Sequence, residues 1–243
     1  MAVGSLSVIL PAFNEAENIG HSITRAISTC EALGLEFEII VVDDGSNDET
    51  KRLSEEYCAI DSRVRTVCHP KNRGYGAALK SGILDSTCDL IFFTDADLQF
   101  DIGELERLLV HAGQHDIIAG FRAVRSDPFV RKFNAWGWGK IVNALFDLDV
   151  LDVDCAFKVF NRRVFETLPI HSVGAFVNTE ILVRAKAAGF SIKQLPVSHF
   201  PRPAGQQSGA DLKVIGKAFC ELYRLRGDLN QSVEKHQGLL RVQ

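Results

Sequence analysis

The chain has 243 residues, of which 46% are hydrophobic and 24% charged, ordinary values for a globular domain, and its formal net charge is −4. A net negative charge argues against general nucleic-acid binding, so no nucleic-acid partner is expected. The six cysteines show no C-x-x-C spacing, which disfavours a zinc site and is typical of reduced cysteines in an intracellular protein.

No apolar stretch approaches the roughly 18–20 residues that a transmembrane helix needs, so none is predicted. The first residues, MAVGSLSVILPAFNE, lack a basic segment followed by a long apolar one. No signal peptide is therefore expected, and the expected location is the cytoplasm.

Residues 5–120 alternate short apolar runs with helical patterns. Strands are predicted at residues 5–10, 37–42, 64–68, 89–94 and 116–120, and one helix at residues 75–85. Three further helices are predicted to begin with a capping box, which pairs Asn14 with Glu17, Ser46 with Glu49 and Asp101 with Glu104. This alternation implies an α/β fold with a mostly parallel sheet and helices on both faces.

Polar clusters follow four of these strands, and they read PAFNE, DDGS, HPKNRG and DADLQ. In open α/β sheets, ligands bind beyond the carboxyl ends of the strands. We therefore expect the four clusters to converge on one site.

The second half is patterned less regularly. Asp127 and Pro128 are typical of the first positions of a helix, which is predicted to reach about Phe146. The segment DCAFKVF predicts a strand, and the following elements are predicted as a helix at 178–188, a strand at 191–197 and a last helix at 211–226. Residues 227–243 are weakly patterned and are expected to form a mobile tail.

The motif DADLQ places two carboxylates one residue apart behind a buried strand. In an extended backbone, Asp95 and Asp97 would point the same way, about 7 Å apart, and Gln99 would continue the row. Because buried carboxylates are costly without a partner and oxygen ligands suit Mg²⁺ or Mn²⁺, a metal site is favoured. A strand-end turn with capping aspartates is the alternative, and it explains Asp101 better than Asp97.

The other motifs are less specific. DDGS fits either a tight turn or a carboxylate, Asp43 or Asp44, that binds a nucleobase or ribose. NRGYGAALKSG contains Gly74 and Gly76 but matches neither a dinucleotide fingerprint nor a Walker A loop. Arginine side chains suit phosphate oxygens, and the basic candidates in the second half are Arg122, Arg125, Arg131, Lys132 and Arg202.

The motifs P-A-F-N-E, V-D-D-G-S, N-R-G-Y-G-A-A, D-A-D-L-Q, D-C-A-F-K and R-P-A-G-Q-Q, in this order, resemble family 2 glycosyltransferases. Within that family the chain resembles the dolichyl- or polyprenyl-phosphate mannosyltransferase (or glucosyltransferase) branch over about residues 5–226. The resemblance implies a GT-A fold, which is a Rossmann-like, mostly parallel sheet with C-terminal acceptor-side helices. It divides a single domain, residues 1–226, into a nucleotide-binding half at about 1–122 and an acceptor half at about 123–226.

The resemblance also implies the ligands and their residues. These are a nucleoside-diphosphate sugar of the GDP-mannose or UDP-glucose class, Mg²⁺ or Mn²⁺, and a polyprenyl-phosphate lipid. The nucleotide-binding residues would be Pro11, Ala12, Asn14, Glu15, Asp43, Asp44, Gly74, Asp95 and Ala96. Asp95, Asp97 and Gln99 would hold the metal and diphosphate, the catalytic residues would be Asp97, Gln99, Arg122 and Arg202, and the acceptor side would include Arg131, Trp136, Asp154 and Glu180.

Two departures from the family pattern stand out. Many relatives continue DADLQ with His-Pro-Pro, whereas this chain has Phe100-Asp101-Ile102, which bears on the placement of the donor and not on the metal site. Many relatives also carry a transmembrane tail, for which this sequence shows no apolar stretch.

The expected reaction is an inverting transfer of mannose or glucose to the lipid phosphate. A phosphate acceptor is largely ionised at neutral pH and needs no general base, whereas a sugar hydroxyl would need one, with Asp154 or Glu180 as the candidates. A nucleotidyltransferase and a non-catalytic sugar-nucleotide-binding protein are weaker alternatives, because PAFNE is not a glycine-rich basic loop and the metal ligands are all present.

A membrane contact is expected at the helix that follows Pro128. Trp136 falls among basic and polar residues of this helix, as tryptophan does at membrane interfaces. The last helix has an apolar arc that could lie on a membrane or dock on its own domain. We therefore expect peripheral binding at the cytoplasmic face of a membrane.

Overall fold

The computed structural model describes residues 4–124, 129–204, 216 and 218–229. The strands are β1 (Leu6–Ala12), β2 (Phe37–Asp43), β3 (Val64–Cys68), β4 (Leu90–Phe93), β5 (Ile117–Arg122), β6 (Lys158–Asn161) and β7 (Ile192–Val197). The helices are α1 (Ile19–Ala32), α2 (Thr50–Ile60), α3 (Tyr75–Asp85), a 3-10 turn at Ile102–Glu104, α4 (Leu105–Leu109), α5 (Phe129–Phe146), α6 (Arg162–Thr167) and α7 (Val177–Ala187). Residues 218–229 are also helical.

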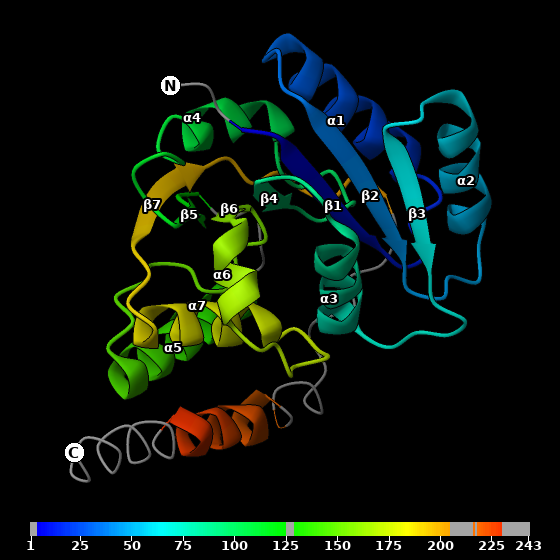
Figure 1. The fold of residues 1–243 in the computed structure, drawn as a ribbon. Coiled ribbons are helices and arrows are strands. Elements are labelled where there is room, and N and C mark those ends of the chain that lie inside the picture. Colours follow the sequence, from blue (N-terminus) through cyan, green and yellow to red (C-terminus); the bar gives the residue numbers. More distant parts are fainter. Residues whose placement is uncertain (1–3, 125–128, 205–215, 217, 230–243) are drawn as a thin grey trace, which may run out of the picture.

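The described strands form one sheet in the order β3-β2-β1-β4-β6-β5-β7. Strands β1, β2, β3 and β4 pair in parallel, and so do β5 and β7. Only β6, in this part of the chain, runs against its neighbours β4 and β5. The prediction of a mostly parallel sheet is confirmed, and the carboxyl ends of β1, β2 and β3 point to one edge (Figure 1).

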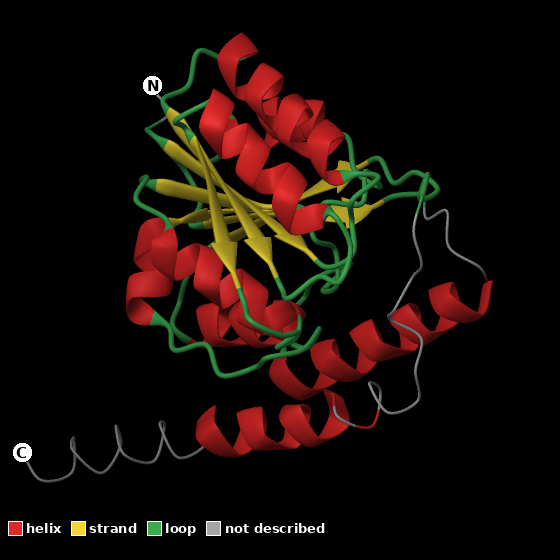
Figure 2. Cartoon of the chain, turned by 90° about the vertical axis from the view of Figure 1, so that its right-hand side faces the viewer, coloured by secondary structure: helices red, strands yellow, loops and turns green. Residues whose placement is uncertain are grey.

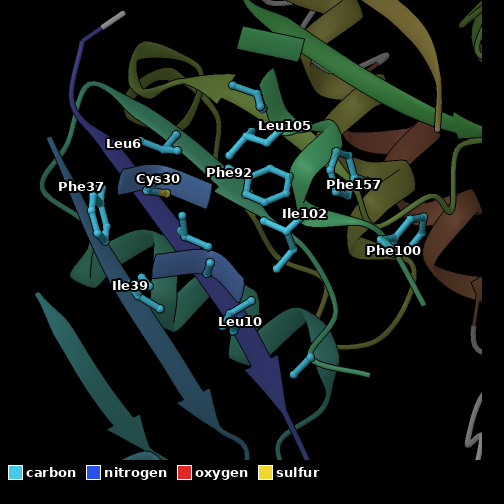
Figure 3. Packing of buried hydrophobic residues seen from close by; sticks show 14 of the residues in the cluster. Leu6, Leu10, Cys30, Phe37, Ile39, Phe92, Phe100, Ile102, Leu105 and Phe157 are labelled. Carbon is cyan, nitrogen blue, oxygen red and sulfur yellow. The ribbon is translucent and has the colours of Figure 1, made fainter. Parts of the chain in front are cut away.

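Helices cover both faces of the sheet (Figure 2). Alternating strand residues explain the two layers, because Leu6, Val8 and Leu10 of β1 pack with α1, α2 and α4, whereas Ile9 packs on the other face. Around the first layer, Phe92 meets Phe157 edge to face, with ring centroids 4.8 Å apart (Figure 3). The second layer contains α3, α5, α6, α7 and residues 222 and 225 of the last helix.

A buried carboxylate organises the amino edge of the sheet. Glu38 accepts hydrogen bonds from the Ser7 hydroxyl at 2.6 Å, from the backbone N–H and hydroxyl of Thr87 at 2.6 and 3.0 Å, and from Arg65 at 2.9 Å. Burial alone would raise its pKa, but these donors outweigh burial and the pKa of Glu38 is lowered. The charge is therefore fully compensated at this edge.

Several predicted boundaries need correction. Helix α1 begins at Ile19 and α2 at Thr50, so the capping roles predicted for Asn14 and Ser46 are wrong. The two residues bind each other's loops instead, since the Asn14 N–H donates to the Ser46 hydroxyl at 2.9 Å. The cap at Asp101 is confirmed by a bond from the Gly103 N–H at 3.1 Å.

The predictions for the second half have mixed outcomes. The short helix α6 was not predicted. Residues 127 and 128, residues 211–215 and 217 of the predicted last helix, and residues 230–243 lie outside the described residues. Residues 216 and 218–226 of that helix are helical as predicted, and residues 227–229 continue the helix instead of belonging to a tail. The proposed division into halves stays a prediction.

Candidate active site

The polar clusters behind the first strands lie together, as predicted. The Asp44 N–H donates to the Ala12 carbonyl at 2.9 Å, and the His69 N–H donates to the Asp43 carbonyl at 2.9 Å. The Thr94 N–H donates to the Ile9 carbonyl at 3.2 Å. These bonds join the carboxyl ends of β1, β2, β3 and β4 into one platform.

DADLQ forms a turn at this platform, not the extended row that was expected. Leu98 has a φ of 60°, and the Gln99 N–H donates to the Asp97 carboxylate at 3.1 Å. The Gln99 side chain donates to the Phe200 carbonyl at 3.1 Å and so holds a late segment of the chain. Ala96 is fixed by the Ser22 hydroxyl, which donates to its carbonyl at 2.8 Å.

Asp95 carries a destabilised negative charge. Burial, together with the like charge of Asp97, raises the pKa of Asp95 to about 7. The buried hydroxyl of Tyr75 lies near Asp95 but completes no hydrogen bond of ordinary geometry within the described residues. Two crowded carboxylates and an unsatisfied hydroxyl form an oxygen-rich site that fits Mg²⁺ or Mn²⁺.

Arg202, from the second half of the chain, lies against Glu15 and Asp97 at the ends of β1 and β4. Its guanidinium is ion-paired with Glu15 and lies 3.7 Å from the Asp97 carboxylate. Burial raises the pKa of Glu15 despite the opposing bonds from Asn18 and Arg202. Glu15, Asp97 and Arg202 therefore form one nearly buried charge cluster. Their predicted roles toward nucleotide, metal and phosphate stay predictions.

Arg122 binds the Asp152 carboxylate through two hydrogen bonds. Its Nε and Nη2 donate to the two oxygens of Asp152 at 2.6 and 2.7 Å. Arg122 also lowers the pKa of Asp95 through its charge, so the two lie near each other. The predicted contact of Arg122 with phosphate stays a prediction, and the structure adds Asp152 as its anchor.

A cavity of about 580 Å³ opens beside the ends of β2 and β3. Most of its lining comes from the PAFNE, DDGS and HPKNRG clusters, namely Phe13, Asp43, Gly45, Ser46, His69, Pro70, Lys71 and Asn72. The adjoining Asn47 and Cys68 and Lys51 of α2 complete it. The sequence did not single out Lys51 or His69. The volume of the cavity is in the range of pockets that hold small organic ligands.

The two adjacent aspartates of DDGS have different surroundings. Asp43 lines the cavity, whereas the Asp44 carboxylate accepts from His69 at 2.6 Å and from the N–H groups of Arg73 and Gly74 at 2.9 and 2.8 Å. Asp43 is thus the one that lines the cavity, and the predicted nucleotide contacts of Asp43 and Asp44 stay predictions.

Gly74 has a steric role that the sequence did not reveal. Its φ is 100°, and a Cβ there would meet the Val173 carbonyl oxygen at 2.4 Å. Its N–H is bound by Asp44. The motif thus lets the second half of the chain approach α3 closely, and a direct contact of Gly74 with nucleotide stays a prediction.

The residues predicted for the acceptor side differ in burial and in hydrogen bonding. Glu180 is buried, and its carboxylate accepts from the Ser172 N–H at 2.7 Å and from Arg184 at 2.9 Å, with a further bond from the His171 N–H. It therefore fastens the segment before α7. Asp154 is half-buried in the turn before β6, and Trp136 is 60% exposed on α5. The Arg131 side chain lies outside the described residues.

A buried lysine lies below the Asp152–Asp154 turn. Lys158 is fully buried and donates to the Val153 and Cys155 carbonyls and, at 3.2 Å, to Asn178. Burial lowers the pKa of Lys158. The sequence motif DCAFK contained this residue, but its apolar neighbours gave no sign that the ammonium group has acceptors.

None of the described helices is long and apolar enough to cross a membrane.

Comparisons with known proteins agree with this arrangement. The fold is similar to that of glucosyl-3-phosphoglycerate synthase from Mycobacterium tuberculosis, solved with Mn²⁺, UDP and phosphoglyceric acid, with a TM-score of 0.72 and 23% identity over 92% of this chain and 79% of that one. It is also similar to mannosyl-3-phosphoglycerate synthase from Rubrobacter xylanophilus, with a TM-score of 0.70 and 21% identity over 93% of this chain and 75% of that one. These likenesses identify the fold as GT-A.

Sequence comparison gives the family. Glycosyltransferase AglD from Haloferax volcanii is 33% identical over an alignment of 207 residues, which covers 81% of this chain and 33% of that protein. The chain thus spans about a third of the length of this curated relative. The family model described as glycosyl transferase family 2 matches residues 7–168. The chain belongs to glycosyl transferase family 2.

Proposed function

We propose that this chain is an inverting hexosyltransferase that moves mannose or glucose from a nucleoside-diphosphate sugar to a polyprenyl phosphate. The observation that carries the donor half of the proposal is the Asp95–Asp97 pair after β4, at the same edge of the sheet as the cavity that Asp43 lines. A nucleoside in the cavity would place its diphosphate toward these carboxylates and Arg202. The donor is of the GDP-mannose or UDP-glucose class.

A bound cation would offset the mutual repulsion of the two carboxylates. Asp95 and Asp97, with Gln99 as a third oxygen donor, would hold Mg²⁺ or Mn²⁺. When bound, the cation would supply charge that stabilises the diphosphate as a leaving group. The M. tuberculosis neighbour was solved with Mn²⁺ and UDP, which supports this choice of ligands.

The residues of this chain have three tasks in the transfer. Asp43 and the cavity orient the nucleoside, and Arg202 offers a cation to the diphosphate while Glu15 holds that arginine in place. An acceptor phosphate oxygen then forms a bond to the anomeric carbon as the bond from that carbon to the diphosphate oxygen breaks. The nucleoside diphosphate leaves with the electron pair, and the configuration at the anomeric carbon inverts.

A phosphate acceptor is favoured because the Glu180 carboxylate, a candidate base, already accepts several hydrogen bonds within the protein. A phosphate monoester is already mostly ionised at pH 7, since its second pKa is about 6, and it needs no base. Glu180, a candidate base for a hydroxyl acceptor, is occupied by backbone N–H groups and Arg184. The phosphoglyceric acid in the M. tuberculosis neighbour is also a phosphorylated molecule, so a small phosphorylated acceptor is the second candidate.

The lipid nature of the acceptor is supported by α5. Trp136 is 60% exposed, and Lys140, one turn further along, is exposed as well. An exposed tryptophan next to a lysine is typical of a membrane interface. We therefore propose that this helix contacts the cytoplasmic face of a membrane, and that Arg131 and Asp154 lie on the acceptor side.

The test is nucleotide release from UDP-glucose and GDP-mannose with Mg²⁺ or Mn²⁺, with and without polyprenyl phosphate in vesicles. Nucleotide release that requires the lipid supports the proposal. Nucleotide release that requires phosphoglycerate or a sugar alcohol instead would show that the acceptor is that compound and not a polyprenyl phosphate. Asp95→Asn should lower the rate more than about 100-fold. Asp101→Asn, which removes a nearby carboxylate charge but leaves an amide oxygen that can cap the turn, is the matched control and should retain the rate.

A further inference from the structure

We propose that Tyr75 is a positioning residue for Asp95: its hydroxyl donates to that carboxylate, in a direction that Asn178 and Lys158 set. This inference rests on the proposed donor and metal site. Tyr75 is the first residue of α3, Asn178 is the second residue of α7, and Lys158 begins β6. Three elements from both halves of the chain therefore meet behind the carboxylate.

Two buried hydroxyls beside Asp95, those of Tyr75 and Thr94, lack a hydrogen-bond partner in the described part of the chain. They are the only buried side-chain oxygens or nitrogens there of which this is true. Thr94 lies between the end of β4 and Asp95, and the Tyr75 hydroxyl lies near the Asp95 carboxylate. Because buried hydroxyls without partners are unfavourable and rare, their coincidence beside one carboxylate indicates a site that is completed when its ligand binds.

The direction of the hydrogen bonds follows from Lys158. Its ammonium group can only donate, so the Asn178 atom that lies 3.2 Å from it is the amide oxygen. The amide nitrogen of Asn178 is then left for the Tyr75 hydroxyl, which lies near Asn178 as well as near Asp95. An amide nitrogen only donates, so the Tyr75 hydroxyl accepts from it and keeps its own proton for Asp95.

The ammonium group that starts this chain of donors is firmly placed. Lys158 is fully buried, and its Nζ also donates to the carbonyls of Val153, at 3.2 Å, and Cys155. In the sheet, Lys158 is paired with Phe93, and its Nζ lies 5.8 Å from the centre of the Phe93 ring. Phe93 is the last residue of β4, so the chain of donors begins beside the strand that carries Asp95.

Tyr75 has the properties that a donor to Asp95 needs. Burial and the negative charge of Asp95 raise the pKa of its hydroxyl well above the usual value, so the hydroxyl stays protonated. Its ring packs on the second core layer, and α3 packs against α7. Groups that hydrogen-bond a metal-binding carboxylate fix its orientation, and their loss typically weakens metal binding tenfold or more.

Tyr75→Phe removes the hydroxyl and keeps the ring. We expect the dissociation constant of Mn²⁺, measured by electron paramagnetic resonance with UDP or GDP present, to rise about tenfold. The melting temperature of the free protein should not fall, because the hydroxyl completes no hydrogen bond there. Tyr57→Phe is the matched control, since the Tyr57 hydroxyl lies 3.1 Å from that of Thr24 on α1, and it should leave Mn²⁺ binding unchanged.

Asn178→Asp tests the direction of the chain. It keeps an oxygen for Lys158 but replaces the donor nitrogen by a second oxygen, to which Tyr75 can donate instead of to Asp95. The added negative charge would by itself strengthen the binding of a cation, whereas loss of the Tyr75 bond weakens it. We expect the dissociation constant of Mn²⁺ to rise about threefold or more, with no further rise when the substitution is added to Tyr75→Phe.

Each outcome bears on the inference. Unchanged Mn²⁺ binding in Tyr75→Phe, or an equal loss in Tyr57→Phe, would overturn it. Tighter binding in Asn178→Asp would show that charge governs the site, and additive losses in the double variant would show that the two residues act independently, so either result would overturn it as well. If the original chain bound no Mn²⁺ with either nucleotide, the proposed function itself would fail, whereas equal binding by the original chain and Tyr75→Phe removes the inference alone.

Discussion

The guanidinium of Arg202 is ion-paired with Glu15, although the two residues are 187 positions apart in the chain. Arg202 also donates to the Ala204 carbonyl at 2.6 Å and lies 3.7 Å from Asp97. The late segment of the chain is thus closed over the ends of β1 and β4. One side chain therefore links the late segment to Glu15 and Asp97.

Arg202→Gln should therefore impair the reaction strongly. It removes a cation from Glu15 and Asp97 and leaves Glu15 buried beside a carboxylate. We expect kcat/KM for the donor to fall about 100-fold, measured by nucleotide release. Arg202→Lys keeps the charge but not the planar fork, and it should recover only part of the loss. Equal activity of the glutamine and lysine variants would contradict a role for the charge.

Gly74→Ala should destabilise the fold. The left-handed backbone and the Val173 oxygen at 2.4 Å both oppose a Cβ, and the expected loss of unfolding free energy is about 2 kcal/mol or more. Chemical denaturation measures it. Gly137, in α5, has open space around it, so Gly137→Ala should be neutral or stabilising by about 0.5–1 kcal/mol.

Asp116 predicts a pH-dependent difference in stability. Burial would raise its pKa, but bonds from the Ser191 N–H and hydroxyl and from Arg163 outweigh burial, so the pKa of Asp116 is lowered. The folded protein then binds this proton less tightly than the unfolded chain does. Its stabilisation is fully present above the unfolded pKa, about 3.9, and is lost as the pH falls through the folded pKa.

Asp116→Asn should accordingly cost about 2 kcal/mol of unfolding free energy at pH 7 and progressively less below about pH 4. Urea denaturation of both proteins across this range is the measurement. The exposed Asp147 supplies the control, since Asp147→Asn should change the unfolding free energy at pH 7 by less than about 0.5 kcal/mol. A cost that stayed constant down to pH 2 would show that the carboxylate charge is irrelevant.

Lys158→Met should destabilise the protein although it replaces a buried charge with an apolar chain. The carbonyls of Val153 and Cys155 and the Asn178 side chain would lose their common donor, at a cost of about 2–4 kcal/mol. Thermal and chemical denaturation report the change. Lys186→Met, at an exposed position of α7, should stay within about 0.5 kcal/mol.

The sheet and the position of its active edge were predictable because both depend on local patterns. Apolar runs of strand length, separated by helical patterns, fixed the order of the first strands, and the polar clusters fell at their carboxyl ends. The turn at Leu98 was not predictable in this way, since a leucine rarely adopts a positive φ. The prediction of an extended row from Asp95 to Gln99 was therefore wrong, although the motif does follow a buried strand as predicted.

The remaining errors share a cause, which is a partner far away in sequence. Asn14 and Ser46 each look like a helix cap, yet they bind across 32 residues. Gly74 makes room for Val173, and Lys158 finds Asn178, 20 residues further on. A local pattern shows which group a residue offers, and only the assembled fold shows which group receives it.

The bonds around Glu38 have a consequence for how this scaffold can change. They join β1, β2, β3 and the turn before β4 at the edge opposite the cavity. Residues of the loops that line the cavity can then change without disturbing the charges that align the strands. Hydrogen bonds hold the strands together at one edge of the sheet, and the loops at the other edge can vary in sequence. This arrangement suits a fold whose similar structures include a glucosyl- and a mannosyl-3-phosphoglycerate synthase.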